Sequence, residues 1–324
     1  MTDRTPLVTI VGGSGFIGRY VAQRMARRGW RVRVACRRPN EALFVKPYGS
    51  VGQVEPIQCN IRDDASMRRV IQGADAVVNC VGVLWENGRN RFDAVQGEGA
   101  ARVARLSAEE GVKRVVHISA IGANAESESQ YARTKAEGET QIQAVRPDAV
   151  ILRPSVLFGT EDQFFNMFAG LSRFAPVLPL VGGKTRFQPV WVEDVAEAAA
   201  RAAVGDVQPG IYELGGPRVA TLKECISLML RVIRRRRLIA DVPFFLARLK
   251  AWFLEKPAIV GVKPMLTRDQ VKLLEVDNVV ASDALGFAEI GIEPTAMEAV
   301  IESYLYCHRP YGQYTALSED RARA

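Results

Sequence analysis

One junction constrains this chain more than any other feature: an apolar strand runs directly into three spaced glycines and then a helix. The segment is Val8 to Gly18, VTIVGGSGFIG. The first glycine makes a tight turn, the second lets the backbone approach a pyrophosphate, and the third allows close helix–strand packing. The helix then directs free N–H groups and the positive end of its dipole at the anion. The junction therefore predicts a dinucleotide site whose contacts come from Gly12, Ser14, Gly15, Phe16, Ile17 and Gly18.

Apolar runs alternate with helical patterns along the first two thirds of the chain. We expect strands at 7–11, 31–36, 53–59, 76–83, 114–119, 149–153 and 210–216, and helices at 66–72, 97–110, 129–145 and after a strand at 190. This alternation predicts a doubly wound parallel α/β sheet of the Rossmann type, with a smaller, mostly helical C-terminal domain. We expect domains at 1–215, with an excursion at 160–190 contributing to the smaller domain, and at 216–307, followed by a tail at 308–324.

The second strand is followed by two arginines, Arg37 and Arg38, and no acid appears until Glu41. In an NAD site a carboxylate about twenty residues beyond the glycines binds the ribose 2′-hydroxyl. A guanidinium matches a phosphate, whereas a carboxylate would repel it. The sequence therefore favours NADP(H) over NAD(H). The alternative is that both arginines are solvated loop charges.

Composition limits the function classes. The net charge of +7 suggests an anionic partner, but no recognition motif supports nucleic-acid binding. Five scattered cysteines are typical of reduced thiols, and two histidines make a His-rich metal site implausible, so no metal is expected. The first strand begins almost at once, and no apolar run approaches the roughly 18 residues of a membrane span. We therefore expect no signal peptide and at most peripheral membrane attachment.

Further motifs follow in order along the chain. They are Tyr131-x-x-x-Lys135, LRPSVLFG at 152–159, QPVWVEDVA at 188–196 and YELGG at 212–216. With the glycine turn, this set resembles the extended and atypical short-chain dehydrogenase/reductase superfamily over about the first two thirds of the chain. A spacing of four places Tyr131 and Lys135 on one helix face, so both can point into one cleft. Taken alone, the pair also fits any surface helix.

The resemblance implies roles for these residues. Tyr131 would exchange a proton with the substrate oxygen, while Lys135 would hold the nicotinamide ribose and lower the pKa of the tyrosine. The superfamily usually places a serine or threonine at the end of the fifth strand, where direct alignment puts Ala120. Ser119 lies one residue early and could serve only if the strand ends in a bulge. The other implied cofactor contacts are Asn60, Ile61, Cys80, Val81, Gly82, Ile118, Ser119, Pro154 and Val156.

A narrower likeness comes from HISAIGA at 117–123, SQYARTKAEGE at 129–139 and the basic C-terminal part. Here the chain resembles the NADPH-binding accessory subunits of respiratory complex I, in a bacterial form. That resemblance implies a structural role with little turnover, beside the quinone module of the peripheral arm, on the cytoplasmic face of the bacterial inner membrane. Two alternatives stay open: a free-standing NADPH-dependent reductase or epimerase using Tyr131 and Lys135, and a scaffold with an empty nucleotide cleft.

A basic run and an apolar stripe stand out in the C-terminal third. Arg231 and 234–237 precede the segment 244–254, in which Phe245, Leu249 and Trp252 recur at helical spacing. Such a helix could lie on an anionic bilayer or in a groove of a partner. Equally, it could be a core helix with a solvated basic edge.

Overall fold

The computed structural model describes residues 4–255, 264 and 266–314, and in that part of the chain seven parallel strands form one sheet. Their order, β11-β6-β5-β4-β1-β2-β3, places the first strand near the middle and confirms the predicted doubly wound fold. The expected strand at 76–83 ends early, at Asn79. The bounds are β1 (Leu7–Val11), β2 (Arg31–Cys36), β3 (Val54–Gln58), β4 (Ala76–Asn79), β5 (Arg114–Ile118), β6 (Val150–Pro154) and β11 (Gly210–Leu214).

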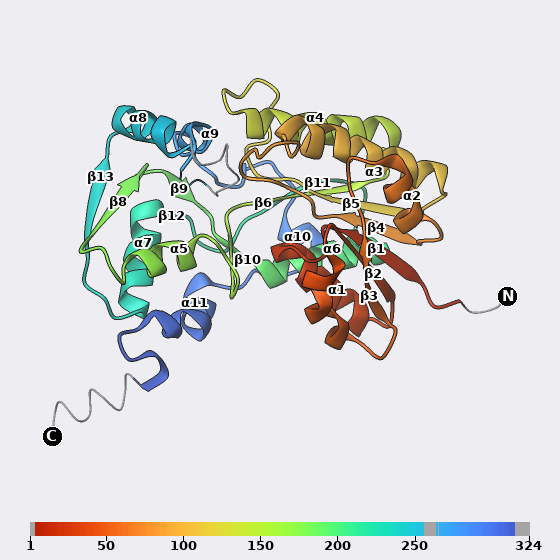
Figure 1. Cartoon of the computed structure of the whole chain (residues 1–324), viewed down its shortest axis with the longest axis horizontal. Helices are drawn as coiled ribbons and strands as arrows, with labels where there is room; N and C mark the ends of the chain where they lie inside the picture. The colour runs from red at the N-terminus through yellow and green to blue at the C-terminus, as the bar shows by residue number, and fades with distance from the viewer. Residues whose placement is uncertain (1–3, 256–263, 265, 315–324) are drawn as a thin grey trace.

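Helices cover both faces of the sheet (Figure 1). Strand β1 is buried throughout, with Val8 and Ile10 in the hydrophobic core of one face and Leu7 and Val11 in that of the other. On the first face lie α1 (Phe16–Arg27), the 3₁₀ segment η1 (Pro39–Tyr48) and α6 (Val192–Val204). On the second lie α2 (Asp64–Ile71), the π turn η2 (Asp93–Gly97), α3 (Glu98–Glu109) and α4 (Gln130–Val145).

A second, smaller unit lies beside the sheet (Figure 1). It has its own hydrophobic core, which combines Phe165 from the excursion at 160–190 with Met229 and Ile301 from the C-terminal part. Its elements are β7 (Leu157–Phe158), α5 (Phe165–Leu171), β8 (Val177–Val181), β9 (Arg186–Phe187), β10 (Val190–Trp191), β12 (Ala220–Thr221), α7 (Leu222–Val232), β13 (Leu238–Val242), α8 (Phe244–Leu254), α9 (Arg268–Leu273), α11 (Met297–Leu305), η4 (Tyr306–His308) and η5 (Gly312–Tyr314). Helix α10 (Phe287–Ile290) packs instead into the core on the first face of the sheet. The expected domain boundaries stay a prediction.

The C-terminal part is helical, as predicted, but it also contains strands that the sequence did not indicate. Strand β13 pairs in parallel with β8, with Leu238 opposite Val177. Strand β12 pairs in antiparallel fashion with β9. Within the described ranges, no helix has the length and apolar character needed to cross a bilayer.

Candidate nucleotide site

The glycine turn has the close packing that a pyrophosphate cradle requires. Gly12 has a φ of +78°, a left-handed conformation that favours glycine. A Cβ on Gly18 would lie 2.6 Å from the Cα of Gly13, so only glycine allows the helix to approach the turn. Helix α1 begins at Phe16 with no side-chain cap and no acidic residue in its first turn. The N–H groups of Phe16, Ile17 and Gly18 are therefore the donors that α1 can offer to an anion.

Strand β2 ends beside this turn and carries the two arginines. The Ser14 side chain hydrogen-bonds to the thiol of Cys36, the last residue of β2. Arg37 and Arg38 follow and are exposed, and Arg38 forms a 3.0 Å ion pair with Glu41. Two guanidinium groups therefore lie one and two residues beyond a strand end that contacts the glycine turn.

The segment after β4 approaches the same turn. A Cβ on Gly12 would lie 3.2 Å from the backbone nitrogen of Val81, so the two backbones approach closely. The buried surroundings of the Cys80 thiol raise its pKa to about 12, which keeps it protonated and unreactive. Farther along the sheet edge, the Asn60 side chain accepts the Arg62 N–H at 3.2 Å. The buried Ile61 side chain contacts α3, since a Cβ on Gly99 would meet it at 3.0 Å.

Lys135 reaches the same edge from α4. Its Nζ donates to the Ile118 carbonyl at 3.0 Å, and it lies 3.5 Å from the position of a Cβ on Gly82. The lysine is 4% exposed, and burial lowers its pKa to about 8. Lys135, Ile118 and Gly82 are thus brought together at the carboxyl ends of β4 and β5, where nucleotides bind in doubly wound sheets.

Tyr131 lies one helical turn before Lys135 and is partly buried against the edge of the Phe92 ring, 6.0 Å between centroids. Burial raises the pKa of Tyr131 to about 12. The resemblance implied a lowered pKa, but in this environment desolvation dominates. At neutral pH the phenol can donate a proton or a hydrogen bond, but it is a poor general base.

Several buried polar atoms near Lys135 have no hydrogen-bond partner among the described residues. Ser119 Oγ, Gln96 Oε1 and His117 Nε2 are all unbonded, and the three residues are 2–4% exposed. His117 Nδ1 pairs with the Asn79 amide at 3.1 Å, and burial lowers the pKa of this histidine. Because buried polar groups are normally satisfied, unbonded ones beside a glycine cradle fit a polar ligand such as a nicotinamide ribose. Sequence analysis missed Gln96, which no motif marks.

The strand containing Ser119 continues in step with β6. The Ser119 N–H donates to the Leu152 carbonyl at 2.7 Å and the Ile121 N–H donates to the Pro154 carbonyl at 3.1 Å. This spacing is that of a regular parallel ladder, so the bulge that would let Ser119 act as the missing hydroxyl is not observed there. Pro154 ends β6, and the Val156 N–H beyond it donates to Asn278 Oδ1 at 3.2 Å.

A C-terminal segment contacts the start of α4, which sequence analysis also missed. Asp269 of α9 accepts hydrogen bonds from Ser129 Oγ, the Gln130 N–H and the Tyr131 N–H at 2.7, 2.7 and 3.1 Å. It therefore caps the helix that presents Tyr131 and Lys135.

Asn278 adds to these contacts. Its Oδ1 accepts from Ser155 Oγ at 2.7 Å, and its Nδ2 donates to the Ile121 carbonyl at 3.2 Å. The loops after β5 and β6 are thus tied together by Asn278. The capping box Thr267-x-x-Gln270 signals the start of α9 in the sequence, but not where that helix docks.

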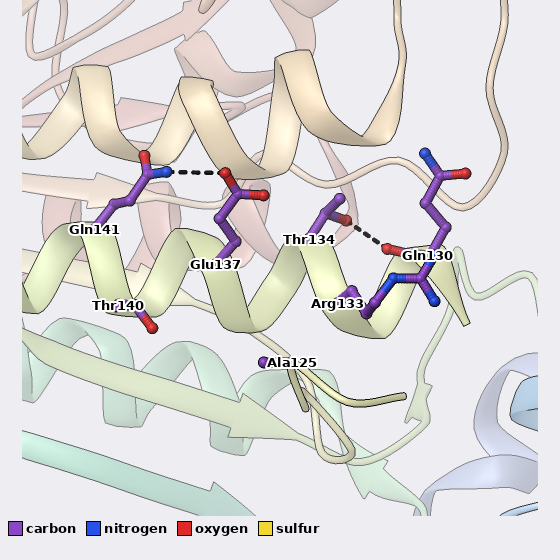
Figure 2. A pocket seen from close by; sticks show the side chains of 7 residues that line it. All are labelled: Ala125, Gln130, Arg133, Thr134, Glu137, Thr140 and Gln141. Atoms are coloured by element: carbon purple, nitrogen blue, oxygen red, sulfur yellow. Dashed lines mark hydrogen bonds between the residues drawn. The ribbon is translucent and has the colours of Figure 1, made fainter. Parts of the chain in front are cut away.

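The opposite face of α4 borders a separate surface hollow (Figure 2). Along it Gln141 Nε2 donates to Glu137 Oε1 at 2.9 Å, and Thr134 Oγ1 donates to the Gln130 carbonyl at 2.9 Å. Neither Tyr131 nor Lys135 lines this hollow, so it is not part of the nucleotide site. Its lining residues are Ala125, Gln130, Arg133, Thr134, Glu137, Thr140 and Gln141.

Comparison with known proteins agrees with this geometry. Residues 8–215 match the model of the NAD dependent epimerase/dehydratase family, and the chain belongs to that family. It is also similar to NADH dehydrogenase (ubiquinone) 1 alpha subcomplex subunit 9, mitochondrial, of Rattus norvegicus, with 32% identity over 94% of this chain and 81% of that protein. The NADH-ubiquinone oxidoreductase 40 kDa subunit of Neurospora crassa is 29% identical over 94% of this chain and 80% of its own length.

Solved structures share the fold. An NADPH-dependent quinone oxidoreductase from Escherichia coli, complexed with NADPH, matches with a TM-score of 0.69 at 18% identity. The match covers 91% of this chain and 99% of that one. The likeness extends over both the sheet and the second unit, and it confirms the predicted superfamily fold.

Proposed function

We propose that this chain is an NADP(H)-binding accessory subunit of respiratory NADH:quinone oxidoreductase, with a structural or assembly role and little or no turnover. The similarity to complex I subunits over 94% of the chain is the observation that supports this most, because it continues past residue 215, where the family match ends. The second unit is therefore shared with those subunits. In a bacterium the chain would lie on the cytoplasmic face of the inner membrane, against the peripheral arm and quinone module.

The cofactor of this proposal is NADP(H). The glycine turn, Lys135 and the unbonded Ser119 hydroxyl would hold the pyrophosphate and the nicotinamide ribose. Arg37 and Arg38 would bind the 2′-phosphate, for which Arg38 must exchange its exposed carboxylate partner Glu41. When bound, the cofactor supplies hydride chemistry, but this chain's own contribution is to bind and shield it.

Two features around Tyr131 support low turnover. Tyr131 has a raised pKa and lacks a hydroxyl partner in the usual strand position, since Ala120 stands there. Asp269 and Asn278 also tie the loops across which a substrate would bind. A site that holds a nucleotide but admits no second reactant behaves as a structural staple, because a ligand that binds only the folded form stabilises it by mass action.

Helix α8 would supply part of the docking surface. Its residues Ala247 and Ala251 are buried, whereas Phe245 is 68% exposed and Leu249 is 58% exposed. These two members of the expected stripe are therefore not core residues, whereas the side chain of Trp252 lies outside the described residues. An exposed apolar pair flanked by Arg248 and Lys250 suits a groove of a partner subunit or an anionic lipid surface.

Mild detergent extraction followed by affinity purification tests the proposal. We expect the chain to co-purify with redox subunits of the oxidoreductase and to release NADPH only on denaturation. Tyr131→Phe should leave both results unchanged. Steady NADPH oxidation with a quinone or carbonyl substrate that this substitution abolishes would instead establish the alternative, a short-chain reductase or epimerase.

A further inference from the structure

Two chain segments that are far apart in sequence meet at the outer edge of the second unit (Figure 1). Strands β8 and β13 lie side by side there in parallel, starting with Val177 opposite Leu238. The Arg237 guanidinium donates to the Ser172 carbonyl at 2.8 Å, and the Leu238 N–H donates to the Pro176 carbonyl at 3.2 Å. The residues preceding both strands therefore form one surface.

The arginine run adopts a fixed conformation at this edge. Helix α7 ends at Val232, Arg234 two residues later has a φ of +54°, and the Arg235 N–H donates to the Leu230 carbonyl at 3.0 Å. This is the hydrogen bond of a Schellman ending, which turns the chain sharply after a helix. The turn directs Arg235 and the residues after it back toward β8.

Positive charge is concentrated at this edge. Burial lowers the pKa of Arg235, and repulsion from Arg237 and Arg173 adds to this shift. In the part of the chain that the structure describes, no carboxylate forms an ion pair with these three arginines or with Arg236. Repulsion among close guanidinium groups favours an external anion at this surface.

Large apolar side chains project from the same edge. Phe174 is 86% exposed and Leu238 is 72% exposed, while Val177, the strand partner of Leu238, is 40% exposed. The Arg173 guanidinium lies 5.9 Å from the Phe174 ring centroid, so charge and apolar surface are interleaved. We call the set Arg173, Phe174, Val177, Arg236, Arg237 and Leu238 the basic apolar edge.

We propose that the basic apolar edge binds the surface of an anionic lipid bilayer. Arginines at the level of the headgroups would meet phosphate, while Phe174 and Leu238 would enter the boundary between headgroups and acyl chains. An acidic protein surface would pair with the arginines, but it would not bury the Phe174 ring, which is 86% exposed. A bilayer surface offers both phosphate and an apolar region. The inference rests on the proposed function for its membrane setting and assigns the lipid contact to a surface other than α8.

Flotation with protein-free vesicles tests this inference on the full chain. We expect binding to phosphatidylcholine vesicles that contain about one third phosphatidylglycerol, weak binding to phosphatidylcholine alone, and loss of binding in high salt. Each arginine near such a surface contributes about fivefold to the partition coefficient. Arg173→Gln with Arg236→Gln should therefore lower binding by about 25-fold, and Phe174→Ser by about tenfold.

Both substituted arginines are exposed, so these variants should fold normally. A matched control is Arg27→Gln with Arg69→Gln, which removes two exposed arginines on the sheet half and should change binding less than about twofold. Equal loss in the two double variants, or equal binding to neutral and anionic vesicles, would overturn the inference.

Failure here can be told from failure of the proposed function. If Arg173→Gln with Arg236→Gln still binds vesicles as the natural chain does but no longer co-purifies with the oxidoreductase, the edge faces an acidic protein and the lipid assignment is wrong. If the chain binds anionic vesicles through this edge but never co-purifies with redox subunits, the proposed function fails and the lipid surface stands.

Discussion

Replacing Arg37 and Arg38 with alanine tests how this chain selects its nucleotide. A charge-assisted bond from a guanidinium to a phosphate contributes about 1.5–3 kcal/mol. Arg38 must first leave Glu41, a 3.0 Å pair whose side chains are 76% and 68% exposed, and such a pair is worth about 0.2–1 kcal/mol. A net contribution of about 1.4 kcal/mol for each arginine gives a tenfold change each, so the double variant should bind NADPH roughly 100-fold more weakly.

Isothermal titration of the nucleotide-free chain with NADPH and with NADH measures this difference. Affinity for NADH should change less than about threefold, because its ribose carries no phosphate for the arginines to bind. Arg31→Ala, an exposed arginine at the other end of β2, is the matched control and should affect neither nucleotide. Glu41→Gln frees Arg38 and should tighten NADPH binding by up to about fivefold. Equal weakening of both nucleotides in the double variant would refute the phosphate argument.

Three further outcomes follow from the site. Asp269→Ala removes three accepted hydrogen bonds at the start of α4 and should lower the free energy of unfolding in urea by about 2 kcal/mol; Asp283→Ala, an exposed control, should not. Burial lowers the pKa of Lys135 from 10.5 to about 8, so between these pH values the unfolded chain binds more protons than the folded one. The free energy of unfolding should therefore rise with pH in this range. Lys135→Met should flatten that slope, and an unchanged slope would contradict the lowered pKa of Lys135. Iodoacetamide at pH 8 should label the exposed Cys307 and spare Cys80, whose pKa is about 12, as peptide mapping would show.

The sequence predicted the nucleotide half of the fold well because its signals are local. The glycine turn, the buried strands and the four-residue spacing of Tyr131 and Lys135 each depend on neighbours in the chain. Their positions in the sheet then follow from the handedness of parallel crossovers. The parallel, doubly wound sheet was therefore accessible from the sequence, whereas the order of its strands was not predicted.

The second unit was less predictable because its elements depend on distant partners. Strand β13 pairs with β8, which lies more than fifty residues earlier in the chain. Because arginines precede it, its sequence resembles a polar loop. Asp269 looks like an ordinary acid in the first turn of a short helix, and only the docking of α9 on α4 gives it a role. The pKa of Tyr131 was also inaccessible, since the sequence shows a nearby lysine but not the burial that outweighs it.

The cap that Asp269 places on α4 has a mechanical consequence. One carboxylate of the second unit holds the first turn of the helix that carries Tyr131 and Lys135. Under the proposed function, docking of a partner on α8 or α9 and nucleotide binding would therefore be coupled, and by reciprocity each would change the affinity for the other by the same factor. A loss of assembly on removing the nucleotide, and a loss of nucleotide on removing the partner, would then be two measurements of one coupling free energy.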